Sequence, residues 1–150
     1  MIINAIKEYI EKCPYLNEFS RGINVNFLDD EISSYSIETV PTNPIIKKYI
    51  DGSSIRQYLF LFCSKESYGQ EVLQNIQNSG FFEKFASWIE KNNKQGILPS
   101  LNDGREAIKI EVLTTGYPFQ TDIDRARYQI QLKLEYFQKG GIKNENSKKI

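Results

Sequence analysis

The sequence has no histidine and only two cysteines, Cys13 and Cys63. Without histidine the chain lacks the most common general base and metal ligand, and it cannot build a Ser-His or Cys-His nucleophile pair. It also lacks both glycine-rich motifs that hold phosphates, Gly-x-x-x-x-Gly-Lys and Gly-x-Gly-x-x-Gly. These absences argue against an enzyme or a resistance factor, and we predict no catalytic residue, no metal and no cofactor.

The two cysteines form no Cys-x-x-Cys motif, and each lies in an apolar pattern. Because free cysteine behaves as a small apolar residue, we expect two buried thiols rather than a disulfide. Buried thiols of this kind suit a protein made in a reducing cytoplasm.

The chain also lacks an excess of charge of either sign, because 19 basic residues balance 19 acidic residues. We therefore expect no global field that attracts nucleic acid or an anionic membrane, and no sequence-specific nucleic-acid partner. Acidic stretches at 29–31 and 122–124 have the oxygen ligands that divalent cations prefer. Acidic loops are more often simply solvated, and we predict no metal there.

No apolar run approaches the length of about 18 residues that a membrane-spanning helix needs. The first twenty residues carry Lys7, Glu8, Glu11 and Lys12 within a helical period, which differs from the apolar segment of a secretory signal. We therefore expect a protein that neither spans a membrane nor is secreted by that route.

Composition favours an ordinary globular protein, with 40% hydrophobic and 25% charged residues. We predict a single α+β domain over residues 1–138. Residues 139–150 contain two adjacent glycines and two adjacent lysines without periodicity, and we predict a flexible C-terminal tail there.

The stretch 51–64 predicts the central strand. It opens on an Asp-Gly turn signal and continues into an apolar run from Tyr58 to Cys63. Because side chains alternate along a strand, Phe60 and Phe62 face one way and Leu59 and Leu61 the other. Both faces need a cover, and we expect a helix of the same chain on one face and either more of this chain or a second copy on the other.

Apolar periodicity predicts the remaining elements. In chain order they are a helix at 2–13, strands at 23–27 and 35–39 separated by an acidic turn, a hairpin at 45–63, a helix at 70–93 with a break or kink near Ser79-Gly80, a strand at 108–112, a turn at 114–118 and a long strand at 126–136. This order favours a mixed, mostly antiparallel sheet with helices packed on one face. The predicted core residues are Phe85, Trp88, Ile89, Ile130 and Leu132.

The aromatic residues of the hairpin and of the long helix allow a second interpretation, as stacking platforms for single-stranded nucleic acid. That function needs interleaved basic residues, and only Arg56 and Lys65 flank the hairpin aromatics. Core packing or a contact between subunits is the favoured interpretation.

Five segments resemble, in order and spacing, a family labelled minor capsid proteins in phages, prophages and phage-tail-like bacteriocins of clostridia and related bacteria. They are PTNP at 41–44, YIDGSS with RQY at 49–58, NSGFFEKF at 78–85, EVLTTGY at 111–117 and ARYQIQ at 126–131. The resemblance covers about residues 5–138, and none of its motifs is catalytic. The family is similar to the tail terminators.

The resemblance implies an α+β subunit of the virion tail or neck, made in the host bacterial cytoplasm. Such subunits close into a ring, commonly a hexamer, on the head-proximal end of the tail tube, where the ring stops tube polymerisation and presents a surface to the neck or head. The implied partners are other copies of the chain, the tail tube protein, and the sheath and neck proteins. A neck or head-completion connector of the same particle is the alternative.

A closed ring requires a head-to-tail contact between different surfaces of neighbouring subunits. Our candidates for this contact are the hairpin 45–63 and the strand at 107–115. The candidate interface residues are Ile45, Tyr49, Arg56, Tyr58, Phe60, Phe62, Glu111 and Arg127.

Overall fold

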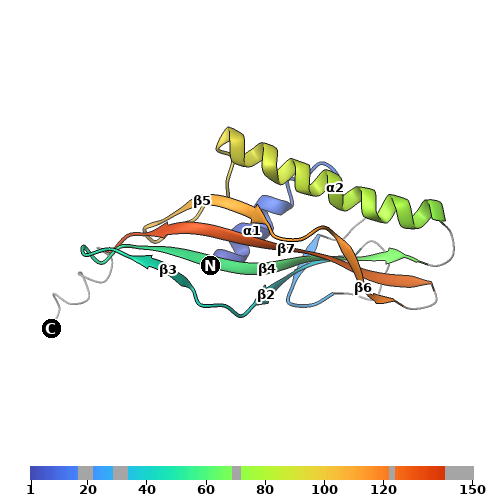
Figure 1. Cartoon of the computed structure of the whole chain (residues 1–150), viewed down its shortest axis with the longest axis horizontal. Helices are drawn as coiled ribbons and strands as arrows, with labels where there is room; N and C mark the ends of the chain where they lie inside the picture. Colours follow the sequence, from blue (N-terminus) through green and yellow to red (C-terminus); the bar gives the residue numbers. More distant parts are fainter. Residues whose placement is uncertain (17–21, 29–33, 69–71, 122–123, 141–150) are drawn as a thin grey trace.

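The computed structural model describes residues 1–16, 22–28, 34–68, 72–121 and 124–140. Its elements are α1 (Ile2–Ile10), β1 (Ile23–Val25), β2 (Ser34–Val40), β3 (Ile45–Lys48), β4 (Ser54–Ser67), α2 (Val72–Gln95), β5 (Arg105–Val112), β6 (Tyr117–Thr121) and β7 (Arg125–Gln138). The strands form one mixed sheet of seven strands, and α2 runs above the long, twisted sheet (Figure 1). The predicted α+β class is confirmed.

The sheet is built around β4 and β7, which pair antiparallel along their whole length. The path through the sheet is β1-β2-β4-β7-β5, with β3 paired to the free part of the β4 edge and β6 to the free part of the β7 edge. The predicted central strand and the predicted long strand are therefore neighbours. Their strict alternation of residues gives each a core face and an outer face.

One pairing differs from the local pattern of the sequence. β1 runs parallel to β2, with Ile23 opposite Tyr35 and Val25 opposite Ile37. The two strands are consequently not the arms of a hairpin. The acidic stretch 29–31 between them lies outside the described residues.

A second difference concerns the segment after β5, where the sequence predicts a turn through Pro118. Tyr117–Thr121 instead forms β6 and pairs with β7, with a register shift between Pro118 and Gln120. Proline cannot donate to a strand ladder, so it is tolerated at a sheet edge and beside an irregularity. The prediction of a turn there is wrong because edge pairing with β7 overrides the local signal.

The sequence predicts a break or kink near Ser79-Gly80, and the structure has no break there, because helix α2 is continuous from Val72 to Gln95. Phe82 and Phe85 follow Gly80 and are 1% and 0% exposed. Their burial against the sheet keeps the chain helical at the glycine. Gly96 directly follows the last helical residue and has the positive φ of 70° typical of a helix C-terminus.

Replacing Gly80 with alanine should raise the free energy of unfolding by about 0.5–1 kcal/mol, because alanine restricts the unfolded chain. A Cβ at position 80 would meet no atom within 4 Å. The matched control is Gly96→Ala, which should lower stability by about 1 kcal/mol because of its left-handed backbone. Urea unfolding followed by circular dichroism measures both, and destabilisation by Gly80→Ala would contradict the continuous helix.

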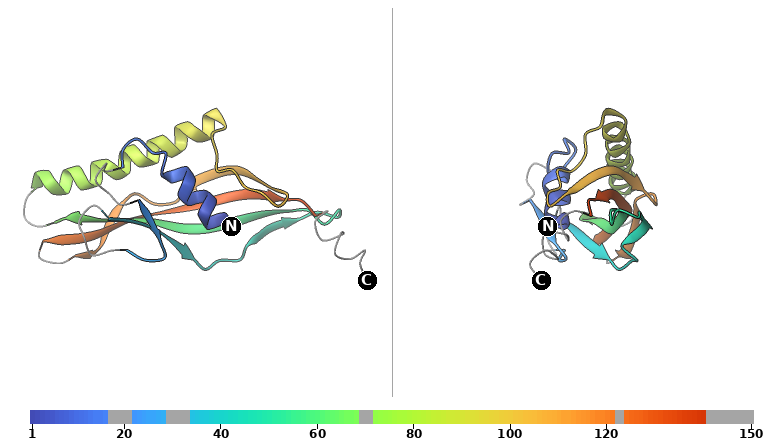
Figure 2. Two further views of the ribbon diagram at one scale, coloured as in Figure 1. Left: turned by 180° about the vertical axis from the view of Figure 1, so that it is seen from behind. Right: turned by 90° about the vertical axis from the view of Figure 1, so that its left-hand side faces the viewer.

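The core lies between the two helices and the covered face of the sheet, as the view along the long axis shows (Figure 2, right). Of the predicted core residues, four are 0% exposed, namely Phe85, Ile89, Ile130 and Leu132. Trp88 is only partly buried and packs at the edge of the core, with its ring centroid 5.1 Å from that of Tyr9. The hydroxyl of Tyr9 accepts a hydrogen bond of 3.0 Å from Asn92, which ties α1 to α2.

Candidate functional site

The face of the sheet opposite the helices carries a ladder of charges at the β5–β7 pair. Lys133 Nζ lies 3.2 Å from Glu111 and 3.6 Å from Glu135, and Lys109 Nζ lies 3.5 Å from Glu135. The four side chains alternate in sign across the two strands. Partly exposed pairs at the protein surface contribute about 0–1 kcal/mol each, so the ladder defines a charged surface more than it stabilises the fold.

Further along the same face, Arg127 forms a two-pronged ion pair with Glu38. Its two terminal nitrogens donate to the Glu38 oxygens at 2.6 and 3.0 Å. Burial alone would raise the pKa of Glu38, but hydrogen bonds from Arg127 and Ser36 outweigh it and hold that pKa below its ordinary value. The predicted interface residue Arg127 is thus half-buried and already paired with Glu38 of its own chain.

The thiol of Cys63 lies beside this pair, 3.1 Å from Arg127, and is fully buried. Burial raises the pKa of Cys63 to about 12, so the thiol is not a nucleophile at neutral pH. Cys13 is also buried, and the prediction of two buried free thiols is confirmed.

The β3–β4 hairpin ends in a well-formed turn at one end of the molecule (Figure 1). Tyr49 N donates to Ser53 O at 2.9 Å, and Asp51 accepts from the backbone N–H of Ser53 at 2.9 Å. The apolar side chains there are nevertheless exposed: Tyr49 is 41% exposed and Ile50 is completely exposed at 108%. We refer to residues 46–50 as the hairpin tip.

The predicted interface residues divide into three groups. Tyr49 and Glu111 are exposed, whereas Ile45, Arg56, Tyr58 and Arg127 are partly buried. Phe60 and Phe62 are 0% exposed inside the monomer. Their assignment to a subunit contact is wrong, because helices α1 and α2 cover their face and leave no surface for another chain.

Two of the edge strands of the sheet, β3 and β5, lie on opposite sides of the central β4–β7 pair. Within the described parts of the chain, β3 pairs only with β4 and β5 pairs only with β7. Each therefore leaves one row of backbone donors and acceptors available for another strand. Lys47 and Lys48 lie on β3, and the exposed apolar residues Ile108 and Leu113 lie on or just after β5.

A groove of about 470 Å³ lies between α2 and the segment that follows β5. Phe82, Ala86 and Ile130 form apolar parts of its lining. The complete lining is Phe82, Glu83, Ala86, Ser87, Glu90, Val112, Leu113, Thr114, Thr115, Gly116 and Ile130. Gly116 closes one side, where an added Cβ would overlap the ring of Phe82.

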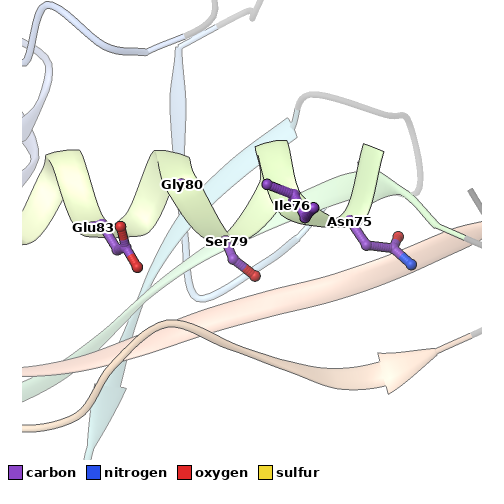
Figure 3. Close-up of a pocket in the computed structure, with 5 residues that line it drawn as sticks. All are labelled: Asn75, Ile76, Ser79, Gly80 and Glu83. Atoms are coloured by element: carbon purple, nitrogen blue, oxygen red, sulfur yellow. The ribbon is translucent and has the colours of Figure 1, made fainter. Parts of the chain in front are cut away.

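A shallower hollow of about 420 Å³ continues along α2 and shares Glu83 with the groove. Its side chains Asn75, Ser79 and Glu83 point from the helix toward the side of β6 and β7 (Figure 3). The sequence indicated the α2 wall of the groove, because residues about two turns apart, such as Glu83 and Glu90, share one face of a helix. What it could not show is the segment 112–116 on the opposite wall.

Two other kinds of site are absent from the described residues. No three side chains of the His, Cys, Asp and Glu types gather there to hold a metal, and residues 29–31 and 122–123 lie outside that part. Neither α1 nor the described α2 has the length and apolar character needed to cross a bilayer. Comparison with protein-family models and with curated sequences finds no match.

Proposed function

We propose that this protein is a structural subunit of a phage or phage-tail-like particle, a tail terminator that closes into a ring on the head-proximal end of the tail tube. The observation that supports this most directly is the exposed apolar hairpin tip, with Ile46, Tyr49 and Ile50 at 46%, 41% and 108% exposure. Apolar residues at the end of a well-ordered turn favour a contact with another protein.

The arrangement of the sheet supports a ring rather than a symmetric dimer. The hairpin and the β5 edge lie on opposite sides of the sheet and differ in residues. A contact between them would join unlike surfaces of two copies, and repetition of such a contact closes into a ring when the rotation between subunits permits. In this proposal the chain has no catalytic role, and its place is the tail or neck of the particle.

The test is the mass of the purified protein across a concentration series, by native mass spectrometry and light scattering, with and without tail tube protein. We expect either a closed ring or a monomer that becomes a ring on tubes, together with tubes that stop growing when the protein is added. A stable monomer or dimer that leaves tube length unchanged would contradict the terminator function.

A neck or head-completion connector of the same particle is the second candidate. The charged ladder of Lys109, Glu111, Lys133 and Glu135 supports it, because helices leave this face uncovered and mixed charge suits a reversible contact. A connector would bind the head or neck proteins and leave tube length unchanged. Binding to tubes in the absence of neck proteins would instead favour the terminator.

A further inference from the structure

We infer that the hairpin tip of one copy seats in the α2 groove of the next copy. The inference rests on the proposed ring and names its contact: the donor surface is residues 46–50, and the recipient is the groove between α2 and residues 112–116. A second copy of this chain is therefore the occupant of the groove.

The hairpin tip has a shape that suits insertion into a groove. Ile50 projects fully into solvent, and Tyr49 beside it is held by the turn and by Lys47, whose Nζ lies 5.1 Å from the ring centroid. Because the turn is already ordered by its hydrogen bonds, insertion of the tip costs little conformational entropy. An ordered apolar projection such as the hairpin tip is best matched by an apolar groove that is also already formed.

The groove has the matching composition. Phe82 and Ile130 lie at its base and are almost fully buried, and Leu113 on its rim is 41% exposed. Its volume of about 470 Å³ accommodates the side chains of Tyr49 and Ile50 together. Docking would remove exposed apolar surface from water on both copies.

The charges of the hairpin tip and of the groove are complementary, and they determine how the docked tip is oriented. The charged residues that line the groove, Glu83 and Glu90, are both exposed carboxylates, whereas the hairpin tip carries Lys47 and Lys48. Asp51 follows the tip, but its carboxylate accepts hydrogen bonds from Ser53 and is directed into the turn. The contact thus brings two cations to two anions.

Spacing agrees with this pairing. Glu83 and Glu90 are about two helical turns apart, or roughly 10 Å along α2. Lys47 and Lys48 are consecutive residues of β3, so their side chains point to opposite faces of the strand and their ammonium groups can lie roughly 10 Å apart. The tip can therefore enter between the two carboxylates with one lysine near each.

Cysteine cross-linking tests the contact directly, because both native thiols are buried and should not react. One sample carries Ile50→Cys and the other Leu113→Cys with a mass tag, and the two are mixed under mild oxidation. We expect a mixed disulfide between them. The matched control replaces Leu113→Cys with Phe27→Cys, at a position 62% exposed and outside the groove, and should give none.

Charge reversal tests the orientation. Lys47→Glu with Lys48→Glu, or Glu83→Lys with Glu90→Lys, should each raise the concentration needed for ring formation about tenfold or more, and all four changes in one chain should restore it. A mixture of the two double variants should also form rings, in which the two variants alternate, because each contact then brings opposite charges together. The control, Lys91→Glu with Lys94→Glu, alters exposed charges of α2 that do not line the groove.

The outcomes separate this inference from the proposed function. Rings that form normally in both double variants, without the mixed disulfide, would overturn the docking of tip and groove and leave the ring intact. The mixed disulfide in a protein that neither forms rings nor stops tube growth would support the docking and overturn the terminator. Absence of both self-association and the disulfide, with tail tubes present as well as without them, would overturn both proposals.

Discussion

Replacing Phe62 with alanine should lower the free energy of unfolding by about 3–5 kcal/mol. The side chain is 0% exposed, and its ring stacks on Phe85 at 4.7 Å and on Tyr35 at 5.6 Å between centroids. It therefore joins β4 both to α2 and to β2. Its removal leaves a cavity that the paired strands β2, β4 and β7 cannot collapse to fill, since their backbones are held in register.

Two further variants calibrate that result, measured by urea unfolding with the slope checked for two-state behaviour. Trp88→Ala should cost less than Phe62→Ala, about 2–3 kcal/mol, because Trp88 is only partly buried at the edge of the core. Phe119→Ala, at a position 58% exposed, should change stability by less than about 0.5 kcal/mol. A Phe62→Ala protein as stable as the Phe119→Ala protein would show that the helices do not cover this face.

Replacing Glu66 with glutamine should stabilise the folded protein above pH 7 by about 1–3 kcal/mol and have little effect near pH 4. Glu66 lies in β4 opposite Ala126, and burial raises the pKa of its carboxyl from 4.5 to about 7. The folded protein thus binds this proton more tightly than the unfolded chain. Stability from this group is lost as pH rises from about 4.5 to 7 and stays constant above that range.

The control is Glu38→Gln, because the contribution of Glu38 to stability changes with pH in the opposite direction. Hydrogen bonds and charge from Arg127 hold the pKa of Glu38 below its ordinary value against the effect of burial, so the stability it contributes is present at neutral pH and is lost in acid. Unfolding free energies measured from pH 4 to 8 compare both variants with the parent protein. Parallel curves for Glu66→Gln and the parent between pH 5 and 8 would contradict the raised pKa of the partly buried Glu66 carboxyl.

Part of the candidate surface could be predicted from residues alone. The Asp51-Gly52 turn between two strand patterns located the hairpin, because such turns have a strong local preference, and Gly52 has the required positive φ of 91°. Tyr49, predicted from the sequence as an interface residue, is 41% exposed there. The groove could not be predicted in the same way, because Glu83 and Leu113 are far apart in the chain and meet only when α2 packs over the sheet.

The sequence by itself determined the elements whose signal is local. Strict alternation over 126–136 predicted β7, and the apolar run from Tyr58 to Cys63 predicted β4, because a period of two residues allows only a strand to place one set of side chains on a single face. The helical spacing of Phe85 and Ile89 likewise identified the buried face of α2.

Only the tertiary structure decided which surfaces are covered. It made β1 parallel to β2, turned Tyr117–Thr121 into an edge strand, and buried Phe60 and Phe62 under the helices while leaving Ile50 in solvent. Each of these outcomes depends on contacts between residues distant in sequence, and such contacts can outweigh local preferences that differ by about 1 kcal/mol per residue. Periodicity shows that a strand has two faces, but packing of the whole chain determines which face remains for a partner.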